Sequence, residues 1–410
     1  MAPNIVALSS IGRFKTSRAA VRCAADSRGD ATSCGSAVGP EDLPQAVWDK
    51  IQDHPCYSED AHHYFARMHI AVAPACNIQC HYCNRKFDCS NESRPGVVSE
   101  KLTPGQAAEK VMAVTAEMPQ LSVVGVAGPG DALANADRTF RAFELVAAAL
   151  PHLKLCLSTN GLALPEHVDR IAAMGIDHVT ITINMVDPEV GARIYPWIFF
   201  RHRRWEGLEA SRILHERQIE GLEALTARGI LVKVNSVLIP GVNDEHLAAV
   251  NAAVRARGAF LHNIMPLISD PAHGTHFGLS GQREPTAEEL RATQDRLGAD
   301  ARLMRHCRQC RADAVGLLGE DCGVEFTLDK LDAKSFDPRR HEMYLSVVAR
   351  ERAHRQKAME AAQMAATKLE PATLIAVASK GGGRINQHFG HATEFQIYEV
   401  DSRGARFVGH

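Results

Sequence analysis

The sequence lacks several features that would assign it to common classes. It has no apolar run approaching the ~20 residues that a membrane-spanning helix needs, so no membrane role is expected. Residues 1–40 have scattered Arg and Ser but no apolar core followed by a cleavage site, so we expect a mobile leader and no secretory signal. A net charge of −2 gives no basic excess for nucleic acid. The eleven cysteines therefore indicate metal binding in a reducing cytoplasm, not the disulfides of a small secreted chain.

Three of these cysteines are the most informative feature. Cys76, Cys80 and Cys83 are spaced CxxxCxxC, with Tyr82 before the last. Three thiolates leave one iron of a four-iron cluster without a protein ligand, whereas ferredoxin-type carriers use four. Zinc would usually take a closed shell of four ligands, and buried structural thiols would not need this spacing. The pattern resembles the radical S-adenosylmethionine (radical SAM) superfamily, in which the open iron is chelated by the methionine part of the cofactor.

Length and composition fit a soluble globular protein of two or three domains: 410 residues, 45% apolar and 23% charged. Apolar β-rich runs alternate with helical patterns across the first large zone. Strands are expected at 69–75, 122–128, 154–160, 178–184, 231–239 and 260–267, and helices at 103–118, 137–150, 166–174, 208–228 and 244–257. Six β-then-α units predict an α/β fold, a parallel sheet curled into a partial (β/α)6 TIM-type barrel of the radical SAM type. Ligands then gather at the C-terminal ends of the strands, where Cys76 falls.

The chain divides into five predicted parts. They are the leader 1–40, the barrel with its N-terminal extension at 41–270, a cysteine-bearing C-terminal extension at 271–335, a helical linker at 336–371, and the beginning of a truncated domain at 372–410. Within the extension, residues 286–289 predict a capping box that opens a helix. The basic stretch 201–204 is interpreted as a solvated loop, with docking of an acidic electron donor as the alternative.

Further cysteines could hold additional clusters. Cys56 precedes the first strand, Cys89 follows the triplet, and Cys156 interrupts an apolar strand, where a small buried hydrophobe is the alternative. Cys307 and Cys310 form a CxxC among arginines that could offset the negative charge of a thiolate-bound cluster, iron–sulfur being favoured over zinc. Cys23 and Cys34 receive no role, and Cys322 stays undecided.

At this point the resemblance becomes closer. The segments 54–69 (HPCYSE through HYFARMH), 75–80 (ACNIQC), 91–97 (NESRPGV) and 305–313 (RHCRQCRAD) resemble the NifB family of nitrogenase cofactor biosynthesis proteins. The match runs from about 41 to 330. The tail, with HFGH at 388–391, resembles the beginning of the domain shared with the cofactor carriers NifX and NafY, here cut short.

The resemblance implies a specific chemistry. Two [4Fe-4S] clusters beside the radical cluster are fused, with insertion of a carbide and a sulfide, into an eight-iron precursor of the nitrogenase cofactor. The carbide comes from the methyl group of one S-adenosylmethionine, and a second is cleaved reductively to a 5′-deoxyadenosyl radical. Implied partners are cluster donor and product carrier proteins and a low-potential electron donor of the ferredoxin or flavodoxin type.

The resemblance also assigns residues. Cys56 and Cys89 are implied ligands of one precursor cluster and Cys307 and Cys310 of the other, with Cys156 serving either. His69 matches the family's nitrogen ligand, a core histidine being the alternative.

Softer assignments concern the cofactor and proton transfer. Gly128, Pro129, Gly130 and Asp131 stand at the superfamily's glycine-rich motif, where a plain turn is the alternative, and glycine allows close backbone approach. The polar strand-end residues Ser158, Asn160 and Asn184 could contact the carboxylate or ribose, and Glu92 could move protons.

Two other functions stay open at this level. A different radical SAM maturase with auxiliary clusters would share the triplet but not explain the HPC segment or the arginine-rich CxxC. A non-catalytic iron–sulfur scaffold would not need an open-iron site.

Overall fold

The structure is a computed structural model that describes residues 43–91, 93–298, 301–331, 336–366, 373–378, 395–401 and 404–409. The expected leader, Cys23, Cys34, Glu92 and the tail segment 388–391 lie outside the described residues.

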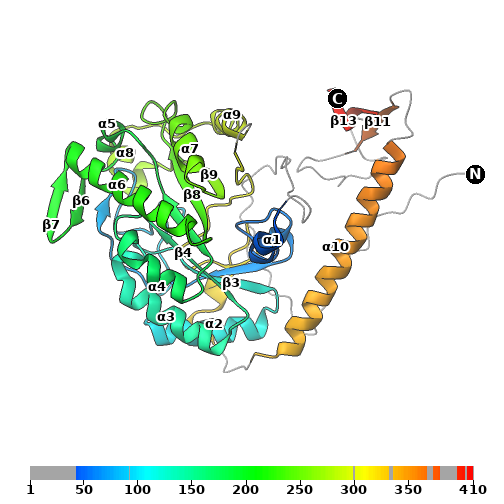
Figure 1. Ribbon diagram of the computed structural model, residues 1–410, viewed down its shortest axis with the longest axis horizontal. Helices are drawn as coiled ribbons and strands as arrows, with labels where there is room; N and C mark the ends of the chain where they lie inside the picture. The colour runs from blue at the N-terminus through cyan, green and yellow to red at the C-terminus, as the bar shows by residue number, and fades with distance from the viewer. Residues whose placement is uncertain are drawn as a thin grey trace, which may run out of the picture.

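A curled seven-stranded sheet forms the centre of the molecule, and it confirms the partial barrel expected from the sequence (Figure 1). Its strand order is β10-β1-β3-β4-β5-β8-β9, with β10 antiparallel to β1 and the other neighbours parallel. The strands are β1 (Ala66–His69), β3 (Leu121–Val126), β4 (Lys154–Thr159), β5 (His178–Thr182), β8 (Leu231–Leu238), β9 (Leu261–Pro266) and β10 (Val315–Gly316).

The predicted helices cover the outer face of this sheet. They are α2 (Pro104–Glu117), α3 (Ala136–Ala149), α4 (Val168–Ala173), α6 (Gly207–Thr226) and α7 (Leu247–Ala256). Thr103 begins α2 with a capping box, in which its hydroxyl accepts from the Gln106 backbone N–H and the Gln106 side chain accepts from that of Thr103. Apolar strand residues such as Val124, Ile181 and Val234 pack with these helices in the core. The alternate strand positions therefore face the barrel interior.

That interior is unusually polar. Thr180, Lys233, Asn235 and Asn263 are all buried there. A polar lining suits a cavity that holds a charged ligand better than a solid apolar core. The Thr180 hydroxyl has no hydrogen-bond partner among the described residues, as expected for a group that faces a ligand.

The first strand departs from its predicted bounds. The sequence predicts a strand at 69–75, but β1 ends at His69, and beyond it the chain makes only an isolated bridge between Ala73 and Pro129. The strand begins earlier than predicted, at Ala66, and it includes the buried Arg67. A search for apolar runs passes over such a charged residue.

Both extensions pack against the barrel. The N-terminal one contains α1 (Gln45–Ile51), and its Tyr57 hydroxyl donates to the carbonyls of Val179 (3.2 Å) and Leu231 (3.3 Å). The C-terminal one runs beside β9, where the His262 N–H donates to the Arg302 carbonyl (3.0 Å), and then forms β10 beside β1. It therefore spans the gap between the two edge strands of the parallel barrel.

A small second sheet was not expected. It consists of β2 (Ile78–Gln79), β6 (Trp197–Phe200) and β7 (Arg203–Glu206), in that order and antiparallel throughout. The stretch 201–204, interpreted from sequence as a loop, is the turn and first half of β7 in the β6–β7 hairpin.

The remaining elements are shorter or lie beyond the barrel. Other α-helices are α5 (Pro188–Ala192), α8 (His276–Leu279), α9 (Ala287–Gly298) and α10 (Pro338–Ala366), and the 3-10 helices are η2 (Ala61–His63), η3 (Leu133–Asn135), η4 (Leu164–His167), η5 (Pro271–His273), η6 (Gly323–Glu325) and η7 (Leu328–Lys330). The Thr286 hydroxyl accepts from the Glu289 N–H (3.1 Å), and the Glu289 carboxylate accepts in return from the Thr286 N–H (2.8 Å), which confirms the capping box.

The long helix α10 occupies the predicted linker, and the strands β11 (Thr373–Val377), β12 (Gln396–Asp401) and β13 (Gly404–Gly409) form a third sheet near its end (Figure 1). In the described ranges, no helix combines the length and apolar character that crossing a bilayer requires. The division into five parts remains a prediction.

Candidate active site

The loop with the cysteine triplet follows β1 and is held by several hydrogen bonds. The Gln79 side-chain amide donates to the carbonyls of Cys80 (2.9 Å) and Cys83 (2.7 Å). The Tyr82 hydroxyl donates to Asn91 Oδ1 (2.5 Å) and accepts from Asn184 Nδ2 (2.7 Å). These bonds hold the loop in one conformation, which is what a preorganised ligand set requires.

The thiols of this loop are close enough to influence one another. Burial raises the pKa of Cys76 to about 11, and burial with the neighbouring charges of Cys83 and Cys76 raises the pKa of Cys80 well above its usual value. The buried Cys89 shows the same pattern, since burial and then Cys83 and Cys76 raise the pKa of its thiol. Clustered buried thiols need a compensating positive charge to ionise. An iron–sulfur cluster supplies it, so these residues fit the predicted group.

No three His, Cys, Asp or Glu side chains within the described ranges converge as ligands of a single metal ion would. In a four-iron cluster each protein thiolate binds a different iron, so its ligands stand farther apart than those of one ion.

The glycine-rich segment after β3 lies directly beside the start of this loop. The Gly130 N–H donates to the Ala73 carbonyl (2.6 Å), and the Asp131 N–H donates to that of Ala75 (2.8 Å). A side chain at Gly130 would overlap the carbonyl oxygen of Ala75. Only glycine permits this approach. The contact fixes the segment against the triplet loop, and its role in cofactor binding stays a prediction.

Two other predicted cofactor residues, Asp131 and Asn184, use their polar side-chain atoms in hydrogen bonds within the protein. The Asp131 carboxylate accepts from the N–H groups of Leu133 (2.9 Å) and Ala134 (3.0 Å) and from that of Asn160 (2.6 Å). The Asn184 amide is engaged by Tyr82 and by Tyr195 (2.8 Å). Both therefore hold neighbouring segments in position.

Two of the predicted cofactor contacts, Asn160 and Ser158, lie at the C-terminal end of β4. Asn160 places Nδ2 3.7 Å from Cys76 Sγ while donating to Asn77 Oδ1 (2.7 Å). Ser158 is buried near the end of β4.

A second group of thiols joins the two extensions. Burial raises the pKa of Cys56 to about 11, with Lys233 opposing the shift and the charges of Cys310 and Cys307 adding to it. Burial also raises the pKa of Cys307, again opposed by Lys233. The charges of Cys310 and Cys307 thus act on Cys56, and those of the triplet thiols act on Cys89. Cys307 also packs against the apolar cluster that contains Cys80, as do Cys76 and Cys83. The pairing of Cys56 with Cys89 that the family resemblance implied stays a prediction.

One buried guanidinium organises this second group. Arg67 is only 2% exposed. Its Nε and Nη2 donate to Cys310 Sγ (3.2 and 3.1 Å), Nη1 donates to the carbonyls of Gly316 and Leu317 (3.1 Å), and Nη2 also donates to that of Glu320 (3.2 Å). A guanidinium has five N–H groups in a fixed fork. Arg67 thus uses its full donor capacity to hold Cys310 and the chain after it.

We predict that Arg67→Met destabilises the C-terminal extension by about 3–5 kcal/mol, since it leaves a buried polar network without its partner. Thermal unfolding and the amount of iron retained after desalting would both fall. Arg67→Lys is the matched control, because it keeps the charge but not the fork, and it should give an intermediate result. An unchanged unfolding temperature in Arg67→Met would contradict the assignment.

His69 and Cys156 lie in one row across the sheet. Each pairs with Gly125, His69 from β1 and Cys156 from β4. The His69 Nδ1 bonds to the Arg311 carbonyl (3.0 Å), so Nδ1 carries the proton and Nε2 has a free lone pair. Burial and then Arg67 lower the pKa of His69 to about 4. A neutral imidazole whose outer nitrogen is fixed by a carbonyl is the usual form of a metal-ligating histidine.

The loop at 89–94 connects the two thiol groups. The Arg94 N–H donates to the Cys310 carbonyl (3.2 Å), and the Asn91 carbonyl accepts from Asn235 Nδ2 (3.0 Å) inside the barrel. Glu92, in the middle of this loop, lies outside the described residues.

Sequence reasoning missed two buried cations, Arg67 and Lys233. Each lies within a buried strand, and a charged residue is almost never fully buried unless it is paired. Cys322, left undecided, is buried behind β10, next to Gly316.

Comparisons with known proteins agree with this geometry. Residues 70–252 match the model of the radical SAM superfamily, and residues 371–410 match that of the dinitrogenase iron-molybdenum cofactor family. The chain is distantly similar to the structure of Streptococcus suis SuiB bound to precursor peptide SuiA. The TM-score is 0.41, with 13% identity over 69% of this chain and 58% of that one.

Curated relatives are much closer. The FeMo cofactor biosynthesis protein NifB of Herbaspirillum seropedicae is 61% identical over 95% of this chain and 75% of its own length. The NifB of Sinorhizobium fredii is 61% identical over 100% and 84%, and that of Rhodobacter capsulatus 65% over 90% and 82%. The chain is therefore a radical SAM enzyme that belongs to the NifB family of FeMo cofactor biosynthesis proteins.

Proposed function

We propose that this chain fuses two [4Fe-4S] clusters, with insertion of a carbide from S-adenosylmethionine and of a sulfide, into NifB-co, the eight-iron precursor of the nitrogenase cofactor. Cys76, Cys80 and Cys83 hold the radical cluster. The two precursor clusters are substrates, and their ligands come from Cys56, Cys307, Cys310, Cys89, His69 and Cys156.

The observation that supports this proposal is a set of thiols beyond the triplet beside one polar barrel interior. Burial and then the charges of triplet thiols raise the pKa of Cys89, and burial with the charges of Cys310 and Cys307 raises that of Cys56. The loop at 89–94 touches the second group through Arg94. A radical SAM enzyme that only cleaved its cofactor would not need the second group.

The bound radical cluster supplies the electron that cleaves S-adenosylmethionine. The chain's own part is to bind and orient. The backbone at 128–130 lies at the start of the triplet loop, where it would receive the methionine part of the cofactor. Asp131 fixes that segment to the end of β4, where Ser158 and Asn160 would contact the cofactor. The prediction that Glu92 moves protons during carbide formation stays open to direct test.

His69 suits a substrate cluster that must leave again. A neutral imidazole gives up iron more readily than a thiolate does, so a ligand set that includes His69 favours release of the finished product. The same reasoning calls for cluster donor and product carrier proteins, and for a low-potential electron donor of the ferredoxin or flavodoxin type, as partners.

The test is anaerobic reconstitution with iron and sulfide, reduction with dithionite, and incubation with S-adenosylmethionine. We expect both 5′-deoxyadenosine and S-adenosylhomocysteine, because one molecule donates a methyl group and another forms the radical. Transfer of clusters without either product would favour a non-catalytic scaffold. Formation of 5′-deoxyadenosine alone would favour a different radical SAM maturase.

A further inference from the structure

The β6–β7 hairpin is joined directly to the loop that holds the radical cluster. Ile78 and Gln79, between the first two cysteines of the triplet, pair with Ile198 and Trp197 of β6. The Phe199 N–H adds a bond to the Asn77 carbonyl (2.7 Å). A protein that touched the hairpin would therefore be one strand away from the ligands of the cluster.

The outer face of this hairpin is aromatic and basic. Phe199 is 51% exposed, although its neighbour Ile198 is fully buried. On this face the Arg204 guanidinium lies over the Trp197 ring (5.0 Å). The Arg203 guanidinium lies over the Trp205 ring (4.1 Å) on the opposite face, since Trp205 pairs with the buried Ile198. Arginine and aromatic side chains are enriched in protein interfaces. The acidic Glu206 is paired with Arg204 (2.7 Å), and this pair is close to neutral, so the excess positive charge of the hairpin comes from Arg201 and Arg203.

The turn of the hairpin is unusual for its sequence. Arg201 and His202 both have left-handed backbones, with φ of 50° and 59°. A two-residue turn of this kind ordinarily takes Asn and Gly, because a side chain there is strained. Strain of this sort persists where surrounding structure holds it and is typical of functional surfaces. It presents two basic side chains at the tip, both exposed.

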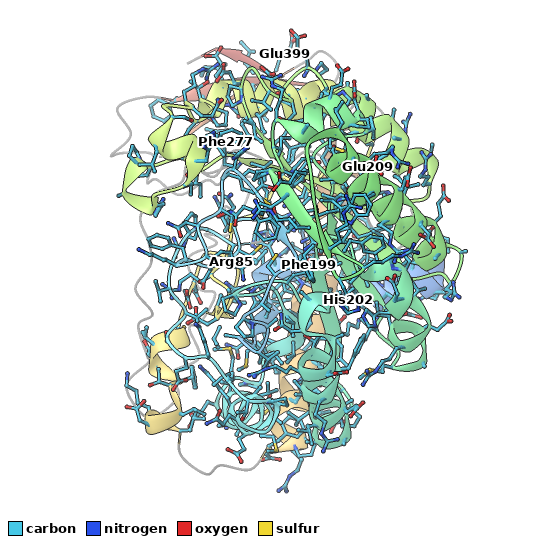
Figure 2. The ribbon with its side chains drawn as sticks, turned by 90° about the vertical axis from the view of Figure 1, so that its left-hand side faces the viewer. Arg85, Phe199, His202, Glu209, Phe277 and Glu399 are labelled. Atoms are coloured by element: carbon cyan, nitrogen blue, oxygen red, sulfur yellow. The ribbon has the colours of Figure 1, made fainter. Side chains whose placement is uncertain are left out.

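A cavity of about 360 Å³ lies beside this face and reaches the cluster ligands. Its lining includes Gln79, Cys80, Cys83, Arg85 and Pro196. Gln79 and Trp197 are cross-strand partners and so point to the same side of the small sheet. Arg85 and the adjacent Lys86 are exposed, and they add positive charge next to Cys83. Figure 2 shows Arg85, Phe199 and His202 together on one face of the molecule.

We propose that this face, formed by the outer side of the β6–β7 hairpin together with Arg85 and Lys86, docks an acidic one-electron carrier protein that reduces the radical cluster. The inference rests on the proposed function, because a radical SAM reaction consumes an electron. The carrier loses one electron and the cluster gains one, with no other bond made or broken. Electron-transfer encounters use small interfaces with charged rims, which this patch fits.

The experiment compares two reductants on the reconstituted full chain. The variant Arg201→Glu/Arg204→Glu should form 5′-deoxyadenosine at the wild-type rate with dithionite, which needs no docking. With a reduced acidic flavodoxin as donor, its second-order rate should fall about tenfold at low salt, as expected when charge steering is lost. The difference between the variant and the wild type should shrink as salt is raised.

The matched control is Arg291→Glu/Arg339→Glu, which makes the same charge change on α9 and α10, away from the hairpin (Figure 1). It should leave both rates unchanged. Equal flavodoxin-driven rates in the hairpin variant and the wild type would overturn the proposal. So would a loss in cluster delivery alone, since the face would then serve a cluster-donating protein.

A second variant, Phe199→Ala, keeps the proposal testable if the double variant loses the dithionite-driven rate, because it removes the exposed ring without changing charge. Phe199→Ala should weaken only the flavodoxin-driven rate, and an unchanged rate would refute the docking face. Absence of 5′-deoxyadenosine from the wild type with dithionite would count against the proposed function itself and not against the docking face.

Discussion

Replacing Cys80 with alanine should abolish the cleavage of S-adenosylmethionine while leaving iron at the other sites. Cys80 is buried, and its thiol lies with those of Cys76 and Cys83. A four-iron cluster held by two thiolates loses the arrangement that leaves a single iron open. The measurement is 5′-deoxyadenosine formed with dithionite, together with iron per chain. We expect no detectable product and a loss of about four irons, the content of one cluster.

Cys156→Ala is the matched control for this variant, because it also removes one thiol from the barrel interior. Cys156 lies on β4 in the row of His69, not in the triplet loop. It should therefore keep the cleavage of S-adenosylmethionine. Loss of all iron from Cys80→Ala would contradict the idea that the clusters bind independently, and equal loss of cleavage in both variants would remove the special role of the triplet.

The fold was largely predictable because its parallel strands and covering helices have clear apolar patterns. One exception concerns a residue whose partners lie far along the chain. Arg67 is buried inside β1 because Cys310 and three carbonyls, from residues about 250 positions later, compensate its charge. A sequence pattern reports local periodicity and carries no information on such distant partners. The expected strand was therefore placed after Arg67 and not around it.

The hairpin β6–β7 was missed for a different reason. Its residues 197–200 are aromatic or β-branched, which favours a strand, but its turn lacks the Asn-Gly pair that signals a tight hairpin. The positive charge in 201–204 then favoured a solvated loop. The segment folds as a hairpin because β6 pairs with the cluster loop, a contact about 120 residues away in sequence.

The candidate site divides in the same way. The triplet was predictable, since three ligands within eight residues show their chemistry locally. The surroundings of the other thiols were not, because Cys56 precedes the barrel strands and Cys307 follows them in the sequence, and the C-terminal extension brings Cys307 back across the gap between β9 and β1. Residue type identified these ligands, and topology decides which of them stand together.

That grouping leads to the second large effect. Replacing Cys307 and Cys310 together with alanine should remove about four irons, the content of one cubane cluster, and should leave 5′-deoxyadenosine formation with dithionite intact. The variant should form no carbide-containing product, because one of the two substrate clusters has lost its site. The result is the reverse of that for Cys80→Ala, so the two variants together separate the radical site from the substrate sites.

Single variants at Cys56 and Cys89 then decide between the structure and the family-based pairing. The charges of Cys310 and Cys307 act on Cys56, so we expect Cys56→Ala to lose iron from the same cluster, and adding it to the double variant should cost no further iron. Cys89→Ala should instead lose iron that the double variant retains, since Cys89 lies with the triplet. Cys56→Ala and Cys89→Ala could instead each remove the same cluster, and the double variant a different one. The pairing of Cys56 with Cys89 would then hold, and the arrangement of the two extensions would have to change when the clusters bind.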